Sequence, residues 1–563
     1  MASDVILFGE CSGMHFLEND YIHRNYIKSS AVLRLGHFLR RRGHKVFQVH
    51  HFSSFSLSEI EAVVRNHVDE NTKVLGISST FISPVKIKTS DSQNIEPICQ
   101  RDFDRINTIL TVAKELNPNI KVVMGGPHTI KLRLQKPKDM VRWRFDEIMK
   151  NVDYTVQEQG EVSLAMLVEG LEPPFEEISG VKHIDGSLLP IVDFSLVANA
   201  PAPLIDGVKF GEALSTELAH GCIFNCEFCG HGRVLGKKVR EYSRSYENLK
   251  KELTYNYEKF GTSMYMFLDD MVNDDPNKVE WLIRIKEETG IPLEWVSYAR
   301  LDVIKTEQQA EKLLKSGCRG IYFGIESMKT DVGPKIGKVT DKEKIISSLK
   351  MVRKVFGDEA FIKVSMIGGL PGETQDEFKS SINWMLHSEE GQHLIDRVSI
   401  TPLVVYREDK GSVSASRNYP FAMYQLNEQM LNDYSAPPDW VSPWGTRTEF
   451  AKLIGSLYNG VNQAFHNAHP FYFPMYHSFG IKLADFIKSY RNRTFTSNPT
   501  NAEIHSKCTN LINEYKRTVL SLTHTDVDNA HQEFWLNFPI ERSELQSNVK
   551  LITFFKSVPN TTI

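Results

Sequence analysis

Short apolar runs alternate with amphipathic stretches along much of this chain, and this alternation limits the folds open to it. Within residues 4–170, apolar residues such as Val32, Leu35 and Phe38 recur at helical spacing between the runs. The runs are Val5–Phe8, Val46–Val49, Val74–Ser78, Lys121–Met124 and Tyr154–Val156. Repeated strand–helix units predict an α/β fold with a parallel, doubly wound, Rossmann-like sheet that binds ligands at the carboxyl ends of its strands.

The same alternation begins again at residue 213. Strands are predicted at Ser215–Cys222, Tyr265–Asp270, Leu293–Arg300, Gly320–Ser327, Phe361–Gly369 and Arg397–Val405, with helices between them. Six such units predict a partial (β/α)6 barrel that is open on one side. In barrels of parallel strands the chemistry lies at the carboxyl ends of the strands.

These patterns divide the chain into four parts. We expect a Rossmann-like domain at 1–175, a linker interrupted by prolines at 176–212, the barrel at 213–405 and a mostly helical C-terminal domain at 406–563. A chain of 563 residues is too long for one hydrophobic core, which agrees with several domains.

Composition limits the setting in which the protein works. A net charge of −4 gives no strong nucleic-acid signal. No apolar run reaches the roughly 18 residues of a transmembrane helix, so we expect neither a membrane span nor a signal peptide. The chain has 7 cysteines, and a cluster of them indicates a metal site in the reducing cytoplasm rather than a disulfide framework.

That cluster is Cys222, Cys226 and Cys229, which directly follow the first predicted barrel strand. Thiolates hold iron–sulfur clusters, and full ligation of a cuboidal cluster takes four of them. Three thiolates therefore leave one iron open to another ligand. The alternative is a structural zinc ion held by the cysteines and His231, which would make the chain a non-catalytic zinc-binding module.

The ends of the other barrel strands carry residues suited to one nucleotide-like ligand. Asp270 ends the second strand, and Arg300 ends the third, where its guanidinium can hold a carboxylate with two hydrogen bonds. Glu326, beside Gly324, can accept hydrogen bonds from an ammonium or ribose group. Ser365 and the glycine pair Gly368 and Gly369 lie on the fifth strand.

In this order, the cysteine spacing and the Asp-Asp, Arg, Gly-Ile-Glu and Gly-Leu-Pro-Gly-Glu-Thr segments resemble the radical SAM superfamily across residues 213–405. The resemblance implies a 4Fe-4S cluster on the three cysteines, whose open iron chelates S-adenosylmethionine. Reduction by a donor such as flavodoxin or ferredoxin then yields methionine and a 5′-deoxyadenosyl radical. It also implies that Glu326 and Arg300 contact the methionine part, Ser365 the ribose and Phe228 the adenine.

The front domain carries small residues after its third and fourth strands. Ser78 and Ser79 follow one strand, and Gly125 and Gly126, which lack a Cβ, let a bulky ligand approach the backbone after the next. This arrangement resembles the cobalamin-binding domain. The loop Gly9–Gly13 departs from it, because it lacks the Asp-x-His-x-x-Gly signature that supplies an axial histidine. Either cobalamin binds without that ligand, or the domain does not bind cobalamin.

The combined resemblance is to cobalamin-dependent radical SAM enzymes, and it implies methylation of an unactivated carbon in a small-molecule or peptide substrate. Cyclisation, rearrangement or another radical reaction is the alternative. The related methylthiotransferases carry a second cysteine triad near the N-terminus, whereas residues 1–212 here hold only Cys11 and Cys99. The methylthiotransferase branch is therefore disfavoured.

Overall fold

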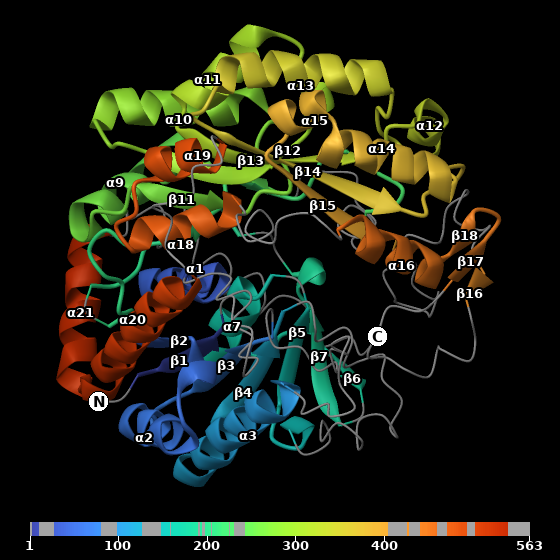
Figure 1. Cartoon of the computed structure of the whole chain (residues 1–563). Helices are drawn as coiled ribbons and strands as arrows, with labels where there is room; N and C mark the ends of the chain where they lie inside the picture. Colours follow the sequence, from blue (N-terminus) through green and yellow to red (C-terminus); the bar gives the residue numbers. More distant parts are fainter. Residues whose placement is uncertain are drawn as a thin grey trace.

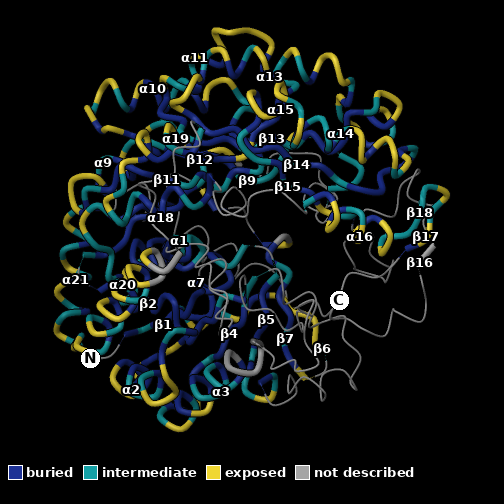
Figure 2. The backbone as a smooth tube through the Cα atoms, viewed as in Figure 1, coloured by how far each residue is buried: buried dark blue, intermediate teal, exposed yellow. Residues whose placement is uncertain are grey.

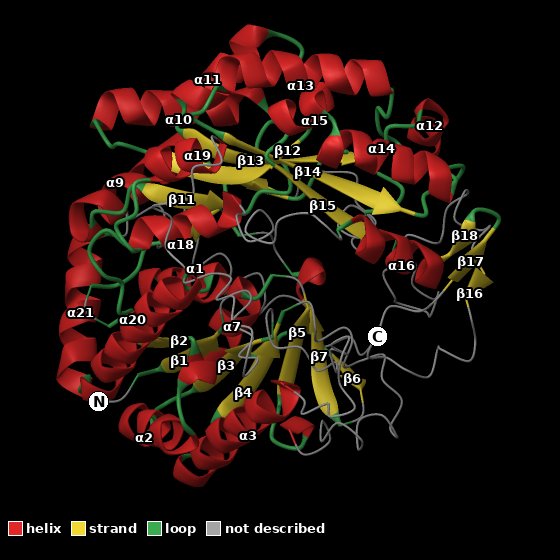
Figure 3. Ribbon diagram, in the orientation of Figure 1, coloured by secondary structure: helices red, strands yellow, loops and turns green. Residues whose placement is uncertain are grey.

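The computed structural model describes most of the chain (Figure 1). The described residues are 3–10, 27–79, 98–126, 148–157, 159–178, 180–189, 192–193, 197–203, 205–224, 226–229, 242–403, 425–426, 440–458, 470–491 and 501–538. Two parallel sheets dominate them, one in the N-terminal part and one in the central part (Figure 3). Among these residues, no helix combines the length and apolar composition needed to cross a membrane.

The N-terminal sheet has the strand order β2-β1-β3-β4-β5-β7-β6. Its first five strands lie where the sequence predicts them: β1 Val5–Gly9, β2 Val46–His50, β3 Val74–Ser78, β4 Lys121–Gly125 and β5 Tyr154–Gln157. Helices α1 (Ser30–Arg41) and α7 (Glu161–Val168) cover one face, and α2 (Leu57–His67) and α3 (Ile98–Leu116) cover the other. The predicted doubly wound sheet is therefore confirmed, and its order reverses between β1 and β3, where such sheets bind ligands.

The predicted linker was wrong in its first ten residues, because they extend this sheet. β7 (Val181–Asp185) pairs in parallel with β5, and β6 (Glu176–Ile178) pairs antiparallel with β7 at the edge. β6 exposes its two glutamates, so it carries no apolar signal that sequence reading would recognise as a strand. The described residues in the rest of the predicted linker, 186–189, 192–193, 197–203 and 205–212, connect the two sheets.

The central sheet is the predicted partial barrel, with the strand order β15-β14-β13-β12-β11-β8 and every pair parallel. The strands are β8 Leu214–Thr216, β11 Met264–Phe267, β12 Glu294–Ala299, β13 Cys318–Glu326, β14 Phe361–Gly368 and β15 Arg397–Pro402. The covering helices are α9 Tyr246–Phe260, α10 Pro276–Thr289, α11 Glu307–Lys315, α13 Lys342–Phe356 and α14 Gln375–His387. Figure 2 shows buried strands beneath helices whose outer surfaces are exposed.

Local signals set the ends of these helices. Asp275 caps α10 by accepting a hydrogen bond from the Asn277 N–H, and Pro276 is its first residue. Gly290 ends the helix with φ of 70°, a left-handed conformation that glycine adopts without strain. These signals are readable in the sequence and fix both ends of α10.

The C-terminal part is helical, as predicted, and its helices share hydrophobic cores with the other two parts. Helix α16 (Arg447–Leu457) packs against β15 and α14 beside the small sheet of β16 (Gln425–Leu426), β17 (Trp440–Ser442) and β18 (Gly445–Thr446). The short helices η8 (Pro470–Tyr472), α18 (Phe473–Ser478) and α19 (Leu483–Arg491) close the amino-terminal end of the barrel interior. Helices α20 (Asn501–Ser521) and α21 (His524–Asn537) pack on the N-terminal sheet.

Candidate functional site

The cysteine loop begins two residues after β8 and is held by a buried carboxylate. Asp269 accepts hydrogen bonds from the backbone N–H groups of Leu218 (2.8 Å) and Ala219 (3.0 Å). Its Oδ1 also lies 2.8 Å from Nζ of Lys278, which is itself buried. Asp269 thus fixes the start of the loop, while its neighbour Asp270 acts electrostatically on Cys222.

The three cysteines are partly exposed and make no disulfide. Burial is the largest of the effects that raise the pKa of the Cys222 thiol to about 11, and the charges of Asp270, Asp274 and Cys226 contribute to that rise. Burial also raises the pKa of Cys226, which the nearby Lys338 and Arg300 oppose. The thiols are therefore close enough to act on one another, and they lie beside cations that stabilise thiolates.

This donor set fits an iron–sulfur cluster. Within the described ranges, no three His, Cys, Asp or Glu side chains are gathered as ligands of one metal ion. Each thiolate of a cuboidal cluster binds a different iron atom, so its ligands need not converge on a single point. His231, the fourth ligand in the zinc alternative, lies outside the described residues.

A second group of polar residues lies at the ends of β13 and β14. Glu326 is buried, and its Oε2 accepts a hydrogen bond from Ser365 Oγ (2.8 Å). Its Oε1 pairs with Lys338 Nζ (2.7 Å), which also donates to the carbonyl of Gly324 (2.8 Å). A Cβ at Gly324 would lie 2.4 Å from Glu326 Oε1 and 2.5 Å from Lys338 Nζ, so only glycine leaves room for this pair.

Lys338 is a residue that the sequence analysis missed. It lies in the loop after the short helix α12 (Gly333–Ile336), where nothing in the sequence distinguishes it from other surface lysines. The fold brings its Nζ to 5.6 Å from the ring centroid of Phe228, in the cysteine loop. The backbone N–H of Glu227 donates to the carbonyl of Ile336 (3.0 Å), which ties that loop to α12.

Arg300 connects the cysteines to the end of β12. Its Nη1 lies 3.5 Å from Sγ of Cys226, and its Nε donates to Asp302 Oδ1 (2.8 Å). The guanidinium also lies 4.1 Å from the ring centroid of Phe224. Asp302 thus holds the guanidinium beside the cysteine loop through both of its carboxylate oxygens. The contact of Arg300 with a ligand carboxylate stays a prediction.

The glycine pair at the end of β14 packs against aromatic side chains. A Cβ on Gly369, which has φ of 90°, would lie 2.3 Å from the Trp440 ring. A Cβ on Gly368 would lie 3.0 Å from Phe450 and 3.2 Å from Phe378. Packing therefore already requires these glycines, and their contact with adenine stays a prediction.

The residues predicted to bind cobalamin lie together at the carboxyl ends of β3 and β4. Ser78 and Gly125 are register partners on β3 and β4, and the Ser79 N–H donates to the Gly125 carbonyl (2.7 Å). Among the described residues, the buried Ser79 hydroxyl has no hydrogen-bond partner. A Cβ on Gly125 would meet only the Val156 carbonyl, at 3.8 Å, and Gly126 has φ of 109°. An unsatisfied hydroxyl beside open backbone fits a large ligand at this edge.

Arg34, on α1, joins this edge to the cysteine loop. Its Nε lies 2.6 Å from Glu161 Oε1 at the start of α7, which directly follows β5. Its Nη1 pairs with Glu217, which lies between β8 and the cysteines. Arg34, whose side chain is 20% exposed, therefore links the carboxyl-end edge of the N-terminal sheet to the segment that leads into the cysteines.

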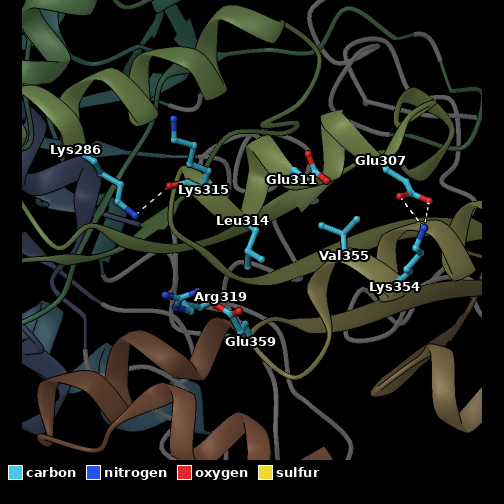
Figure 4. A pocket seen from close by; sticks show the side chains of 9 residues that line it. All are labelled: Lys286, Glu307, Glu311, Leu314, Lys315, Arg319, Lys354, Val355 and Glu359. Atoms are coloured by element: carbon cyan, nitrogen blue, oxygen red, sulfur yellow. Dashed lines mark hydrogen bonds and ion pairs between the residues drawn. The ribbon is translucent and has the colours of Figure 1, made fainter.

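A charged groove between α11 and α13 lies elsewhere (Figure 4). Arg319 and Glu359 line the groove and lie at the amino ends of β13 and β14. The groove is therefore at the opposite end of the barrel from the cysteine loop. Lys354 pairs with Glu307 there (2.6 Å), and Lys286 donates to the Lys315 carbonyl (3.1 Å). The groove has no part in the site described above.

Comparison with known proteins agrees with this geometry. Residues 216–385 match the family model described as the radical SAM superfamily. The chain is 29% identical over 303 residues to an uncharacterized methyltransferase of Pyrococcus horikoshii, covering 49% of this chain and 60% of that protein. It is 26% identical over 223 residues to a tRNA-2-methylthio-N(6)-dimethylallyladenosine synthase of Clostridium botulinum, covering 37% of this chain and 46% of that protein. The chain thus spans less than two thirds of the curated relatives it matches.

Two solved structures share the fold over most of the chain. The radical S-adenosylmethionine methyltransferase TsrM from Kitasatospora setae, with tryptophan substrate and a SAM analogue bound, has a TM-score of 0.59 at 13% identity, covering 87% of this chain and 98% of that one. The cobalamin-dependent S-adenosylmethionine radical enzyme OxsB, with aqua-cobalamin and S-adenosylmethionine bound, has a TM-score of 0.51 at 14% identity. That match covers 95% of this chain and 84% of that one. The order of the two sheets and the helical C-terminal part is therefore common to all three.

Proposed function

We propose that the chain, whose residues 216–385 match the family model of the radical SAM superfamily, is a cobalamin-dependent radical SAM enzyme that methylates an unactivated carbon. The observation that carries the proposal is Arg34, which ties the glycine-lined edge of the N-terminal sheet to the base of the cysteine loop. A ligand on that edge would lie beside the cluster. When bound, the cluster supplies the electron that cleaves S-adenosylmethionine, and the corrinoid supplies the methyl group.

The chain's own residues have distinct tasks in this proposal. Cys222, Cys226 and Cys229 hold the cluster. Glu326, fixed by Ser365, accepts hydrogen bonds from the ammonium of S-adenosylmethionine. Lys338 and Arg300 place positive charge beside the thiolates, where it complements the carboxylate of the methionine part.

Ser365 is also proposed to face the ribose. Phe228 is proposed to face the adenine, and Gly368 and Gly369 are proposed to lie beside the adenine. Asp270, which faces Cys222, is proposed to lie at the rim of the same site. The corrinoid site consists of Ser78, Ser79, Gly125 and Gly126. The proposed substrate is a small molecule or peptide, and the proposed electron donor is a flavodoxin or ferredoxin. Because thiols stay reduced in the cytoplasm, this is the proposed location of the protein.

Anaerobic reconstitution with iron, sulfide, S-adenosylmethionine and a reductant tests the radical step. We expect release of 5′-deoxyadenosine from the wild type and none from Cys226→Ala. Cys318→Ala is the matched control, because Cys318 is buried on β13 with its thiol away from the loop. Equal release from Cys226→Ala and the wild type would contradict the proposed cluster. S-adenosylhomocysteine among the products supports methyl transfer.

Corrinoid binding is tested separately with hydroxocobalamin and Gly125→Ala. The added methyl group meets no atom closer than 3.8 Å in the folded protein, so we expect normal folding. It intrudes on the space where the corrinoid lies, so the bound corrinoid absorbance should fall. Release of 5′-deoxyadenosine by a wild type that binds no corrinoid would instead indicate a radical reaction of another type.

A further inference from the structure

Buried histidines gather where helices α20 and α21 pack on the N-terminal part of the chain (Figure 1). Among the residues that the structure describes, five histidines are at most 3% exposed. Four of them contact side chains of these two helices: His37, His50, His51 and His67. Histidine is the side chain whose charge ordinarily changes between pH 5 and 8, so the contact contains an unusual concentration of groups that respond to mild acid.

His37 of α1 faces α21 through an apolar contact. Its ring lies edge-on to the rings of Phe534 and Phe538, at 5.2 and 4.9 Å between ring centroids. Within the described part of the chain, its buried Nδ1 has no hydrogen-bond partner. Burial lowers the pKa of His37 well below its ordinary value, and the charged groups that face it lower the pKa too, since all are cations: Arg41, Arg40, Arg244 and Lys251. This site therefore accepts only a neutral imidazole.

His67, at the end of α2, faces the start of α21. Its ring stacks on Phe47 at 3.8 Å between centroids and meets the ring of His524 edge-on at 6.0 Å. Neither of its ring nitrogens has a hydrogen-bond partner among the described residues. Burial is the main reason that the pKa of His67 falls to about 4, and the charge of His524 adds to it. Protonating both rings would put two cations into one small contact.

His531 and His50 accept hydrogen bonds that only the neutral ring can accept. The Trp535 Nε1–H donates to His531 Nε2 (3.1 Å), and the Ser29 backbone N–H donates to His50 Nδ1 (3.2 Å). A ring nitrogen that accepts a hydrogen bond carries no proton, so protonation breaks both bonds. Burial lowers the pKa of His531 to about 4 and that of His50 well below its ordinary value.

The carboxylates close to these rings already pair with other cations. The charged groups that face His531 are Arg40, Lys45, Asp4 and Asp528, and those that face His50 and His51 are Lys28 and Arg40. The carboxylates around these groups pair as follows: Asp206 with Arg40, Glu212 with Lys28, Asp528 with Lys45 and Asp4 with Lys73. An added positive charge on a histidine would therefore compete for carboxylates that are already engaged.

We propose that mild acid detaches α20 and α21 as one unit from the N-terminal part of the chain, through protonation of the histidines at this contact. Only residues 522–523 separate the two helices, so they move together. When the contact opens, each histidine regains a pKa near 6.5, so the open form binds more protons than the packed form. The contact is fully stable above pH 6.5 and weakens as pH falls from 6.5 towards 4. This proposal does not depend on the proposed function.

Hydrogen exchange of the full-length reconstituted protein at pH 8 and pH 5.5, corrected for the intrinsic effect of pH on exchange, tests the proposal. A histidine whose pKa rises from about 4 to 6.5 on opening favours the open form about tenfold at pH 5.5. His67 and His531 together should therefore lower the protection of α20 and α21 by about 100-fold, and the other histidines should add to this. Strand β13 of the barrel should keep its protection.

Two variants assign the effect to the histidines. His67→Phe keeps a ring on Phe47 and removes the titration, so its loss of protection at pH 5.5 should be about tenfold smaller than in the wild type. His393→Gln is the matched control, because His393 is exposed on α15 (Glu389–Leu394), and it should behave as the wild type. Should His67→Phe fail to fold, His531→Gln removes a titration while its side-chain carbonyl can accept the bond from Trp535.

Three outcomes would overturn the proposal. The first is equal protection of α20 and α21 at both pH values. The second is an equally large loss of protection in β13, which would indicate that acid unfolds the whole chain rather than releasing two helices. The third is a His67→Phe or His531→Gln variant that folds and has the pH dependence of the wild type.

Discussion

Glu326 has φ of 69°, which side-chain-bearing residues rarely adopt. The register between β13 and β14 shifts at this point, between Gly324 and Glu326. The shift turns the carboxylate toward Ser365 and Lys338 inside the barrel. Strained backbone of this kind persists where neighbouring contacts fix it, and it is common at functional sites.

Replacing Glu326 with Gln keeps the shape of the side chain and removes its charge. Because a hydrogen bond to a charged group contributes about 1.5–3 kcal/mol, we expect the affinity for S-adenosylmethionine to fall by roughly tenfold or more. Equilibrium dialysis on the reconstituted protein measures this. Iron and sulfide content should not change, and unaltered affinity would exclude Glu326 from the binding site.

Glu373 makes stability depend on pH. Its side chain is fully buried, it accepts a hydrogen bond from Ser327 Oγ (2.7 Å), and burial raises its pKa to about 7. The folded protein therefore holds this proton more tightly than the unfolded chain. Stability from this group falls as pH rises from the unfolded pKa near 4.5 to about 7, by about 3 kcal/mol in total.

Glu373→Gln removes this titration. We expect the variant to gain stability relative to the wild type as pH rises from 5 to 8, roughly in the window set by the two pKa values. Urea unfolding at several pH values gives the difference. Parallel pH profiles for the two proteins would show that Glu373 is not the group responsible.

At the scale of elements, the sequence predicted those strands and helices whose hydrophobic residues recur with a clear period. It did not predict features that depend on tertiary packing against distant elements. All six barrel strands were predicted, although the first was expected at Ser215–Cys222 and β8 ends at Thr216. The helices α20 and α21 were predicted as helical, yet their amphipathic pattern does not say which core they join. Lys338 was missed because the loop after α12 meets the site only in three dimensions.

Tyr515 shows what α20 contributes. The side chain is buried, and its hydroxyl accepts a hydrogen bond from the His50 N–H (2.7 Å) on β2. Tyr515→Ala should lower the free energy of unfolding by about 3–5 kcal/mol, as large aromatic truncations in cores do. Hydrogen exchange should speed up in both α20 and β2. Tyr257→Ala is the control, because Tyr257 is 37% exposed on α9 and should have little effect.

At the scale of the whole molecule, buried ion pairs join the N-terminal sheet to the segment that leads into the barrel. Arg40 of α1 makes two hydrogen bonds of 2.7 Å with Asp206. Lys28 pairs with Glu212 at 2.7 Å, and all four side chains are at most 2% exposed. These pairs fix the path of the chain between the two sheets, so this part of the predicted linker is rigidly attached.

Asp206→Ala leaves the Arg40 charge buried without its carboxylate, so we expect a loss of about 3–5 kcal/mol in the free energy of unfolding. The double variant Arg40→Met, Asp206→Leu should recover much of that loss. Glu307→Ala, which breaks the exposed pair with Lys354, should change stability by less than about 1 kcal/mol. Equal effects of Asp206→Ala and Glu307→Ala would contradict this account.

The late position of η8, α18, α20 and α21 in the chain has a consequence for synthesis on the ribosome. The amino-terminal end of the barrel stays open until residues 470–478 emerge, and the core beside α2 and β2 stays incomplete until 501–537 emerge. Both sheets are therefore translated with apolar surface uncovered, and that surface is what chaperones bind. For the same reason, neither sheet can be transplanted into another protein without bringing these distant helices along.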